Sequence, residues 1–314
     1  PIASLVLIRM NGGTAMMRIL GIVGVQICIC LPIIVFQFCK GKEFFSKEYW
    51  GYALRIGIPI VPHYLSGIIL NQGDRIMIDK MVGKTEVALY GLAYSIGMLV
   101  QLFISGMNSA LTPWMYSKIK KGDIRSMRKV LQLLSVVVVG IAVALMLISP
   151  ELVLIFGSPK YREAVYVIPP VAASVFFIFI YNILSMPQFY YEKTQFLMAA
   201  SMAAAGANVV LNFIFIRLFG YIAAGYTTLA CYMLYSVGHY IVSKRILVNE
   251  GIQENLMNPG FLLACSVFLI GASIICNLIF PYRILRYAIL LASAGLVFWK
   301  KELLLKTMAD IRKK

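Results

Sequence analysis

The residues with the most chemistry to offer lie in one apolar stretch, residues 57–79. This stretch carries an imidazole, an amide, two carboxylates and a guanidinium, in His63, Asn71, Asp74, Arg75 and Asp79. Because a helix turns once in about 3.6 residues, these positions gather on one half of a helix, and the other half is apolar. Polar groups at this density inside an apolar segment either pair with one another or line a path for a polar substrate.

Two interpretations of this polar half are open. Arg75 and Asp79 are four residues apart, so they can pair on one helix face and anchor the helix end. Asp74 lies about 26 Å along the segment at about 1.5 Å per residue, close to the far end of a membrane span. This position suits an anchor as well as it suits a substrate contact. Pro59 and Pro62 predict a kink or a loosened turn near the start.

Other polar residues follow a run of small ones. Residues 199–207 contain only Ala, Ser, Met and Gly, which predicts close packing of helix backbones. Asn208 and Asn212 come next, four residues apart, and we expect them to hydrogen-bond to neighbouring helices. His239 is interpreted as structural. Several amides and tyrosines remain open between helix packing, interfacial anchoring and ligand contact: Gln101, Asn108, Asn182, Gln188, Tyr181, Tyr190 and Tyr191.

The elements that must position these residues are membrane-spanning helices. Of the 314 residues, 61% are hydrophobic and 13% are charged, and the mean hydropathy is +0.83. Soluble domains carry about 25% charged residues, so the composition excludes a water-soluble globule, and it also excludes a disordered chain. Apolar blocks of about 20 residues, enough to cross a bilayer, predict nine spans: 17–39, 57–79, 86–112, 130–150, 164–188, 195–218, 221–243, 259–280 and 283–299.

The sequence therefore predicts an all-α polytopic membrane protein. Its formal charge is +16, from 29 Lys and Arg against 13 Asp and Glu. Nine spans place the chain ends on opposite sides, and most basic residues fall in segments that share a side with the C-terminus. Because basic loops face the cytoplasm and meet anionic lipid there, we expect a cytoplasmic C-terminus and no nucleic-acid partner.

The sequence motifs of common enzymes and metal sites are incomplete or absent in this chain. The residues from Val82 to Thr85 end like a phosphate-binding loop, but Ile78 stands where that motif needs glycine. The sequence has no HExxH, G-x-S-x-G or dinucleotide-binding glycine pattern. Cys28-x-Cys30 lacks a second pair of ligands, and the chain has two histidines. We therefore expect no catalytic residues, cofactor, metal or disulfide framework.

Two segments resemble one family of transporters. Residues 57–97 resemble the seventh-helix region of oligosaccharide-lipid flippases, the Wzx-type members of the multidrug/oligosaccharidyl-lipid/polysaccharide exporter superfamily. Residues 207–232 resemble the eleventh and twelfth helices of the same family. The matching positions are Gly57-x-Pro59, Pro62, Leu65-Ser66, Leu70-Asn71, Asp74-Arg75, Gly83, Val87, Tyr90 and Ala93 in the first segment, and Asn208, Leu211-Asn212, Phe219-Gly220 and Ala223-Ala224 in the second.

The resemblance implies a domain organisation. Residues 1–56 would hold the end of a first lobe (span 17–39) and a basic inter-lobe linker. Residues 57–243 would form a complete second lobe of six helices, similar to that of multidrug exporters. Residues 244–314 would form a terminal two-helix hairpin and a basic cytoplasmic tail. The first residue is Pro1, and the resemblance implies that five helices of a first lobe are missing from this chain.

The resemblance also implies a function. Family members move undecaprenyl-diphosphate-linked oligosaccharides across the bacterial inner membrane by alternating access, driven by a proton or sodium gradient, for O-antigen, capsule or exopolysaccharide biosynthesis. The implied partners are membrane lipids, the lipid-linked sugars, and polysaccharide polymerase and chain-length proteins. The physical need is plain, because a charged head group cannot enter hydrocarbon without a polar path.

On this interpretation Arg75 contacts the diphosphate or its sugars, and Asn71, His63 and Asp74 line the substrate path. Asp79 is the candidate for ion coupling, with Asp74 as the other carboxylate that could carry it. The alternatives are a drug or cation exporter of the same fold, a lipid II flippase, and a truncated, inactive product. A membrane polysaccharide polymerase or ligase fits less well, since it needs a long outer loop rich in Arg and His.

Overall fold

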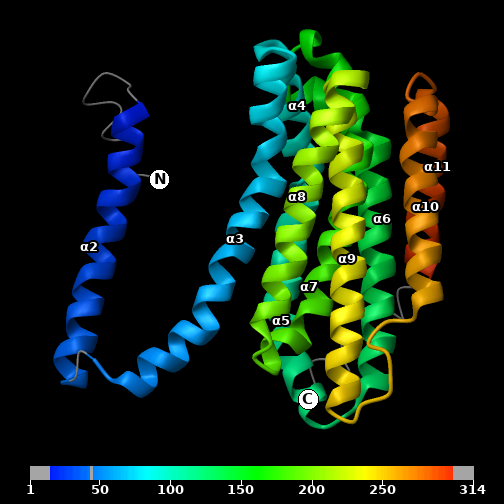
Figure 1. The fold of residues 1–314 in the computed structure, drawn as a ribbon. Coiled ribbons are helices and arrows are strands. Elements are labelled where there is room, and N and C mark those ends of the chain that lie inside the picture. The colour runs from blue at the N-terminus through cyan, green and yellow to red at the C-terminus, as the bar shows by residue number, and fades with distance from the viewer. Residues whose placement is uncertain (1–14, 43–44, 300–314) are drawn as a thin grey trace. The chain divides into compact units, whose positions relative to one another are not determined.

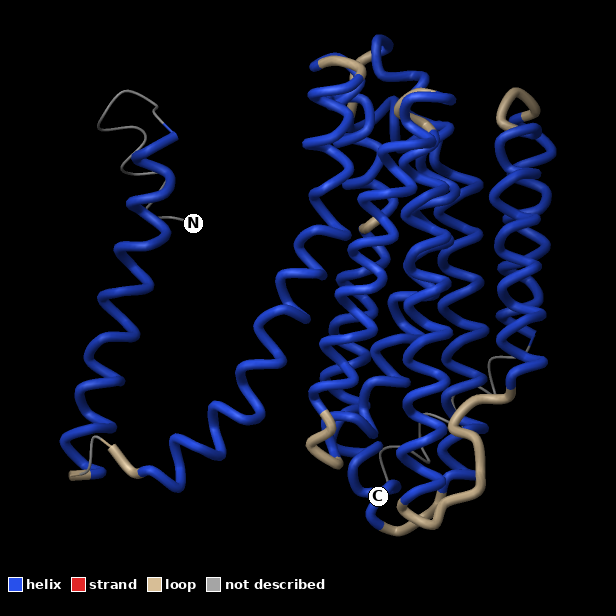
Figure 2. Tube along the Cα trace, viewed as in Figure 1, coloured by secondary structure: helices blue, strands red, loops and turns tan. Residues whose placement is uncertain are grey.

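The computed structural model describes residues 15–42 and 45–299 of the chain. Every regular element in these two ranges is a helix, and short loops join them (Figure 2). The chain divides into two compact units, residues 1–55 and residues 56–314. The predicted basic tail after residue 299 and the start of the chain at Pro1 lie outside the described residues.

Among the described residues, the first unit contains one complete helix and the beginning of another. Helix α2 (Ala15–Gly41) is apolar along most of its length, and its segment Ile19–Gly41 is long enough to cross a membrane. Lys40 follows at the end of the helix, with its Nζ 5.9 Å from the ring of Phe36. Helix α3 (Lys47–Met81) begins in this unit and continues into the second.

The second unit is a helical bundle that continues from α3 (Figure 1). Its further elements are α4 (Lys84–Gly97), α5 (Leu99–Lys120), α6 (Ile124–Phe156), the 3₁₀ helix η1 (Pro159–Val167), α7 (Ile168–Tyr190), α8 (Thr194–Phe219), α9 (Ala223–Asn249), α10 (Pro259–Ile279) and α11 (Arg283–Trp299).

Helices occupy all nine segments in which the sequence predicts a span, which confirms the all-α fold. Seven segments of the described residues are long and apolar enough to cross a membrane, and α9 and α11 are not among them. The span predicted at 86–112 lies within one candidate span, Lys84–Lys120, and the helix is interrupted inside it, since α4 ends at Gly97 and α5 begins at Leu99. A side chain at position 97 would meet the side chain of Val171 in α7 at 2.6 Å, so the break lies where α4 packs tightly on α7.

Two other boundaries differ from the prediction. Helix α3 begins at Lys47 rather than near residue 57, and Pro59 and Pro62 both lie inside it. A proline removes its own backbone N–H and so frees the carbonyl four residues before it. The Oγ of Ser66 donates to the carbonyl of Pro62 at 2.7 Å, within the same helix. The span predicted at 164–188 starts as the 3₁₀ turn η1, and α7 begins at Ile168.

Helix α7 forms the centre of the bundle. Almost all of its side chains are buried, and it packs against α4, α5, α6, α9 and α10. Lipid is as apolar as leucine, so this packing depends on close fit and on interhelical polar bonds rather than on the hydrophobic effect. The few half-exposed residues of α7 include Tyr181, Asn182 and Phe189.

Asp123 fixes the start of α6. Its carboxylate accepts hydrogen bonds from the Lys118 ammonium at 2.6 Å and from the Ser126 hydroxyl at 2.7 Å. These donors stabilise the ionised form and lower the pKa of Asp123 to about 2. A carboxylate at this position also satisfies a free backbone N–H in the first turn of α6, that of Ser126.

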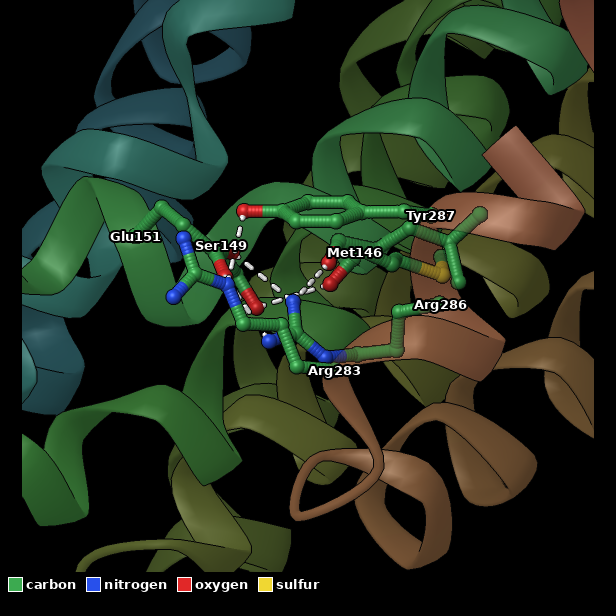
Figure 3. A network of polar contacts seen from close by, with 7 residues as sticks. Met146, Ser149, Glu151, Arg283, Arg286 and Tyr287 are labelled. Carbon is green, nitrogen blue, oxygen red and sulfur yellow. Dashed lines mark hydrogen bonds and ion pairs between the residues drawn. The ribbon is translucent and has the colours of Figure 1, made fainter. Parts of the chain in front are cut away.

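An ion pair ties the terminal hairpin to the bundle. Helices α10 and α11 run side by side (Figure 1), and Arg286 of α11 reaches Glu151 of α6 with two nitrogen–oxygen distances of 2.8 Å. The same guanidinium donates to the carbonyl of Leu147 at 2.6 Å. Figure 3 shows Arg283 and Tyr287 beside this pair. The Arg286 side chain is only 3% exposed, so its charge depends on Glu151 for compensation.

We expect Glu151→Gln to destabilise the protein strongly. Removing one partner of a buried pair leaves the other charge uncompensated, at a cost of about 3–5 kcal/mol. Arg283→Ala is the matched control, because Arg283 is 72% exposed and lies 4.0 Å from the same carboxylate. Its loss should cost less than about 1 kcal/mol. Thermal unfolding of the purified variants in detergent measures both effects, and equal stabilities would contradict the assignment.

Candidate functional site

The candidate site is built on α3, which touches the bundle along a narrow stripe. Its buried residues are Pro59, Ser66, Leu70, Asp74 and Ile78, spaced by seven, four, four and four positions. This spacing places them on one helix face. The rest of α3 between residues 56 and 81 is half-buried or exposed. A helix held in this way depends on the few contacts that the stripe makes.

The strongest of those contacts converge on Asp74, which is completely buried. Its Oδ2 accepts hydrogen bonds from the Tyr90 hydroxyl of α4 at 2.5 Å and from the Thr228 hydroxyl of α9 at 2.7 Å. Its Oδ1 accepts one from the Asn212 amide of α8 at 2.5 Å. Three other helices therefore meet α3 at a single carboxylate.

A second layer of polar groups surrounds this carboxylate. Asn212 also donates to the Oδ1 of Asn208 at 3.2 Å and accepts a short hydrogen bond from Thr227. The prediction that the two asparagines bond to neighbouring helices is confirmed for Asn212. The predicted packing of residues 199–207 is confirmed too, because Ser201, Ala204 and Ala205 are buried where α8 packs against α9. The Nδ2 of Asn208 has no partner among the described residues.

Arg75 and Asn71 lie beside this network and are half-buried. The Tyr94 hydroxyl donates to the Oδ1 of Asn71 at 2.7 Å, and the Arg75 guanidinium lies over the Tyr94 ring at 5.4 Å. The ion pair between Arg75 and Asp79 that the spacing allows is not formed: in the described part of the chain no carboxylate pairs with Arg75, and its Nε has no hydrogen-bond partner. Asp79 is exposed.

His63 lies toward the other end of α3. Its Nδ1 is 3.1 Å from the Tyr235 hydroxyl of α9, and the imidazole is half-buried. His239, four residues after Tyr235, is completely buried and receives the Gln188 amide on its Nδ1 at 2.7 Å. The structure therefore gathers Asn71, Asp74 and Arg75 around Tyr90 and Tyr94, places His63 at Tyr235, and leaves Asp79 apart.

Sequence reasoning missed the partners of these residues. Tyr90, Tyr94, Thr228 and Tyr235 supply the hydrogen bonds, yet hydroxyl side chains are ordinary in membrane helices and carry no spacing signal. Of these four residues, the sequence singles out Tyr90 alone, as one of the positions that match the family it resembles.

This arrangement offers two kinds of charge. Asp74 is a buried carboxylate with hydroxyl and amide donors but no cationic partner within the described ranges. In a medium of low polarity such a group is stable as the neutral acid or with a cation at hand. Arg75 is a half-buried cation that forms no ion pair with the residues described by the structure. The described residues contain no cluster of three or more His, Cys, Asp or Glu side chains that could hold a metal.

Comparisons with known proteins agree with the resemblance seen in the sequence. Residues 2–120 match the family model described as "Polysaccharide biosynthesis protein". Protein 1 of the Lsg locus of Haemophilus influenzae is 28% identical over 172 residues, which cover 51% of this chain and 41% of the relative. An uncharacterised membrane protein of the same organism is 29% identical over 167 residues, covering 50% of this chain and 40% of the relative.

The matches to these curated relatives span less than half of their length. No solved structure matches the chain. The family match and the two relatives agree with the resemblance to polysaccharide exporters. They show that parts of this chain are similar to a family of polysaccharide biosynthesis proteins and to a membrane protein.

The Asp74 network predicts a difference between the two carboxylates of α3. Asp74→Ala leaves the hydroxyls of Tyr90 and Thr228 and the amide of Asn212 without their acceptor, at about 1–3 kcal/mol for each unpaired donor. Asp79→Ala changes an exposed side chain and should stay within about 0.5 kcal/mol. Thermal unfolding of both variants in detergent tests this, and an Asp74→Ala variant as stable as Asp79→Ala would contradict the network.

Proposed function

We propose that this chain is part of a flippase that moves undecaprenyl-diphosphate-linked oligosaccharide units across a bacterial inner membrane for surface polysaccharide biosynthesis. On this proposal the protein works by alternating access, and its C-terminus lies in the cytoplasm, as the loop charges suggest. The observation that carries the proposal is the half-buried Arg75, which has no anionic partner among the described residues. The similarity to polysaccharide biosynthesis proteins supports it independently.

The charge of Arg75 suits a diphosphate. A guanidinium presents five donors in a planar fork, which matches the oxygens of a phosphate group. The Tyr94 ring lies against the guanidinium, 5.4 Å from its central carbon, so the group is held without being neutralised. Asn71 is fixed by the same tyrosine and adds an amide next to the cation. An anionic head group would therefore gain here the charge compensation that hydrocarbon denies it.

Amides on α5 and α7 suit the sugar part of the same substrate. Gln101 and Asn108 of α5 are half-buried, and their side-chain oxygens have no hydrogen-bond partner among the described residues. Asn182 of α7 is half-buried as well, and its amide donates to its own helix at Ile178. Uncharged amides can both donate to and accept from sugar hydroxyls. We propose that these residues line the path of the sugar units.

The buried carboxylate Asp74 is the better candidate for coupling to a proton or sodium gradient. Asp79, the candidate for ion coupling named from the sequence, is exposed, so a proton or cation gained there would be balanced by solvent. Asp74 holds α3 to three other helices, so a change in its charge acts directly on the attachment of α3. We therefore propose Asp74 as a coupling residue rather than as a contact of the sugar head group.

The positive charge of Arg75 also distinguishes this function from its closest alternative. A drug or cation exporter of the same fold would receive a cationic substrate, which an unpaired guanidinium repels. A lipid II flippase would carry another glycan on the same diphosphate carrier, so its substrate is also anionic. A polymerase or ligase is disfavoured, since the loops of the described ranges are short (Figure 2).

We expect Arg75→Ala in the full-length protein to block transport. Losing one charged hydrogen-bonding group costs about 1.5–3 kcal/mol, which lowers the rate at which lipid-linked sugar reaches the outer leaflet at least about tenfold. Spheroplasts probed with an impermeant lectin, before and after lysis, measure that rate. Arg217→Ala is the matched control, because Arg217 stacks on the Phe213 ring at 4.0 Å in an exposed position. Normal transport by Arg75→Ala, at normal protein levels, would reject the substrate role.

Asp74→Asn should separate coupling from substrate binding. The amide keeps the shape of the side chain but can neither lose a proton nor neutralise a cation. We expect sugar transport into the outer leaflet to lose its dependence on the imposed pH or sodium gradient in this variant. Asp79→Asn should keep that dependence. A gradient response that is unchanged in Asp74→Asn would remove the coupling role and leave Asp74 as a structural anchor.

A further inference from the structure

Both histidines of the chain meet at the same tyrosine. The Tyr235 hydroxyl contacts the Nδ1 of His63, and the Tyr235 ring packs edge-on against His239 with a centroid distance of 4.5 Å. The centroids of the His63 and Tyr235 rings are 6.5 Å apart. The site proposed for substrate and coupling ion explains neither His239 nor Tyr235.

The state of His239 follows from its partner. The Gln188 amide nitrogen donates to the carbonyl of Leu184 at 3.3 Å and contacts the Nδ1 of His239 at 2.7 Å. An amide nitrogen only donates, so this Nδ1 must be an acceptor and His239 must be neutral. Three side chains here are at least nine-tenths buried and carry a polar atom that has no partner among the described residues: the Oε1 of Gln188, the Nε2 of His239 and the Oγ of Ser243.

His63 connects the N-terminal part of α3 in this unit to helix α9. Within the described residues, it supplies the one hydrogen bond that joins residues 56–66 of α3 to another helix, because Ser66 bonds back to its own helix at Pro62. The remaining polar contacts of α3, at Asn71, Asp74 and Arg75, hold its C-terminal half. The N-terminal half of α3 in this unit is therefore held by Tyr235 and by the thin stripe of Pro59 and Ser66.

A charge on His63 would have no compensation in this position. The titratable side chains that contact the two histidines are Tyr64 of α3, Tyr181 of α7 and Tyr235 of α9. No ion pair joins either histidine to a carboxylate of the described residues. An imidazolium at position 63 would thus face neutral rings and the buried, neutral His239, so protonation favours a position of α3 in which His63 reaches water.

We propose that His63 and Tyr235 form a proton-binding latch on α3. With His63 neutral, its bond to Tyr235 holds the N-terminal half of α3 against α9. When the imidazole takes a proton from solvent, the uncompensated charge releases this half of the helix, while Asp74 keeps the other half attached. The latch does not depend on which substrate the protein carries, and it is distinct from the coupling role proposed for Asp74.

The accessibility of Ser66 tests the latch without any transport assay. Ser66 is 3% exposed on the buried stripe, whereas Tyr64, two residues earlier, is 67% exposed. In a cysteine-free background of the full-length protein in lipid nanodiscs, Ser66→Cys and Tyr64→Cys are each labelled with N-ethylmaleimide. The ratio of the two rates cancels the pH dependence of the thiol and reports how often α3 is released.

We expect this ratio to rise about tenfold from pH 8 to pH 5.5, because a free histidine titrates near pH 6.5 and pH 5.5 lies about one unit below. With His63→Gln, which keeps polarity but cannot be charged, the ratio should stay low at both pH values. With His63→Arg, which is always charged, it should be high at both. A ratio that ignores pH in the parent, or that rises equally in His63→Gln, would overturn the latch.

Discussion

The buried carboxylate of Asp74 is the constraint on which the arrangement of α3 depends. Inside a membrane no water is present to satisfy a carboxylate, so the protein must supply every partner. Tyr90, Asn212 and Thr228 do so from three different helices. Because the other buried residues of α3 form only a thin apolar stripe, this one group fixes both the position and the rotation of the helix.

Two arginines, Arg286 and Arg75, differ in whether a carboxylate pairs with their guanidinium group. Arg286 is buried and bonded through both terminal nitrogens to Glu151. Its charge is therefore neutralised by the ion pair that holds the terminal hairpin to α6. Arg75 is half-buried, rests on an aromatic ring and has no carboxylate beside it in the described chain. A paired charge within a membrane stabilises structure, and an unpaired one is left free for an anion. The proposed substrate contact follows from this difference rather than from residue type.

The centre of the bundle is packed more tightly than α3 is. Helix α7 is buried on nearly all sides and packs closely on α4 and α5, and at Gly97 the approach to Val171 leaves no room for a side chain. The α4–α5 break therefore belongs to a rigid contact. In contrast, α3 meets the bundle through polar bonds whose strength changes with charge, which is the property that both the coupling role and the latch require.

The sequence by itself determined the class of the protein. Apolar blocks of span length predicted the helices, the spacing on α3 predicted its polar half, and two asparagines after a run of small residues predicted an interhelical contact that Asn212 makes. The resemblance pointed to polysaccharide exporters, and the family match agrees. These features are readable because they depend on periodicity and composition, which a single chain carries along its length.

Only the tertiary structure decided which polar residues pair. Arg75 and Asp79 have the spacing of an ion pair, yet Arg75 turns to Tyr94, and Asp79 remains exposed. Asp74 finds partners 16, 138 and 154 positions away, and His63 meets a tyrosine 172 positions away. Such contacts depend on how helices are rotated and placed against one another, and no local pattern specifies this, because it results from the packing of all their faces at once.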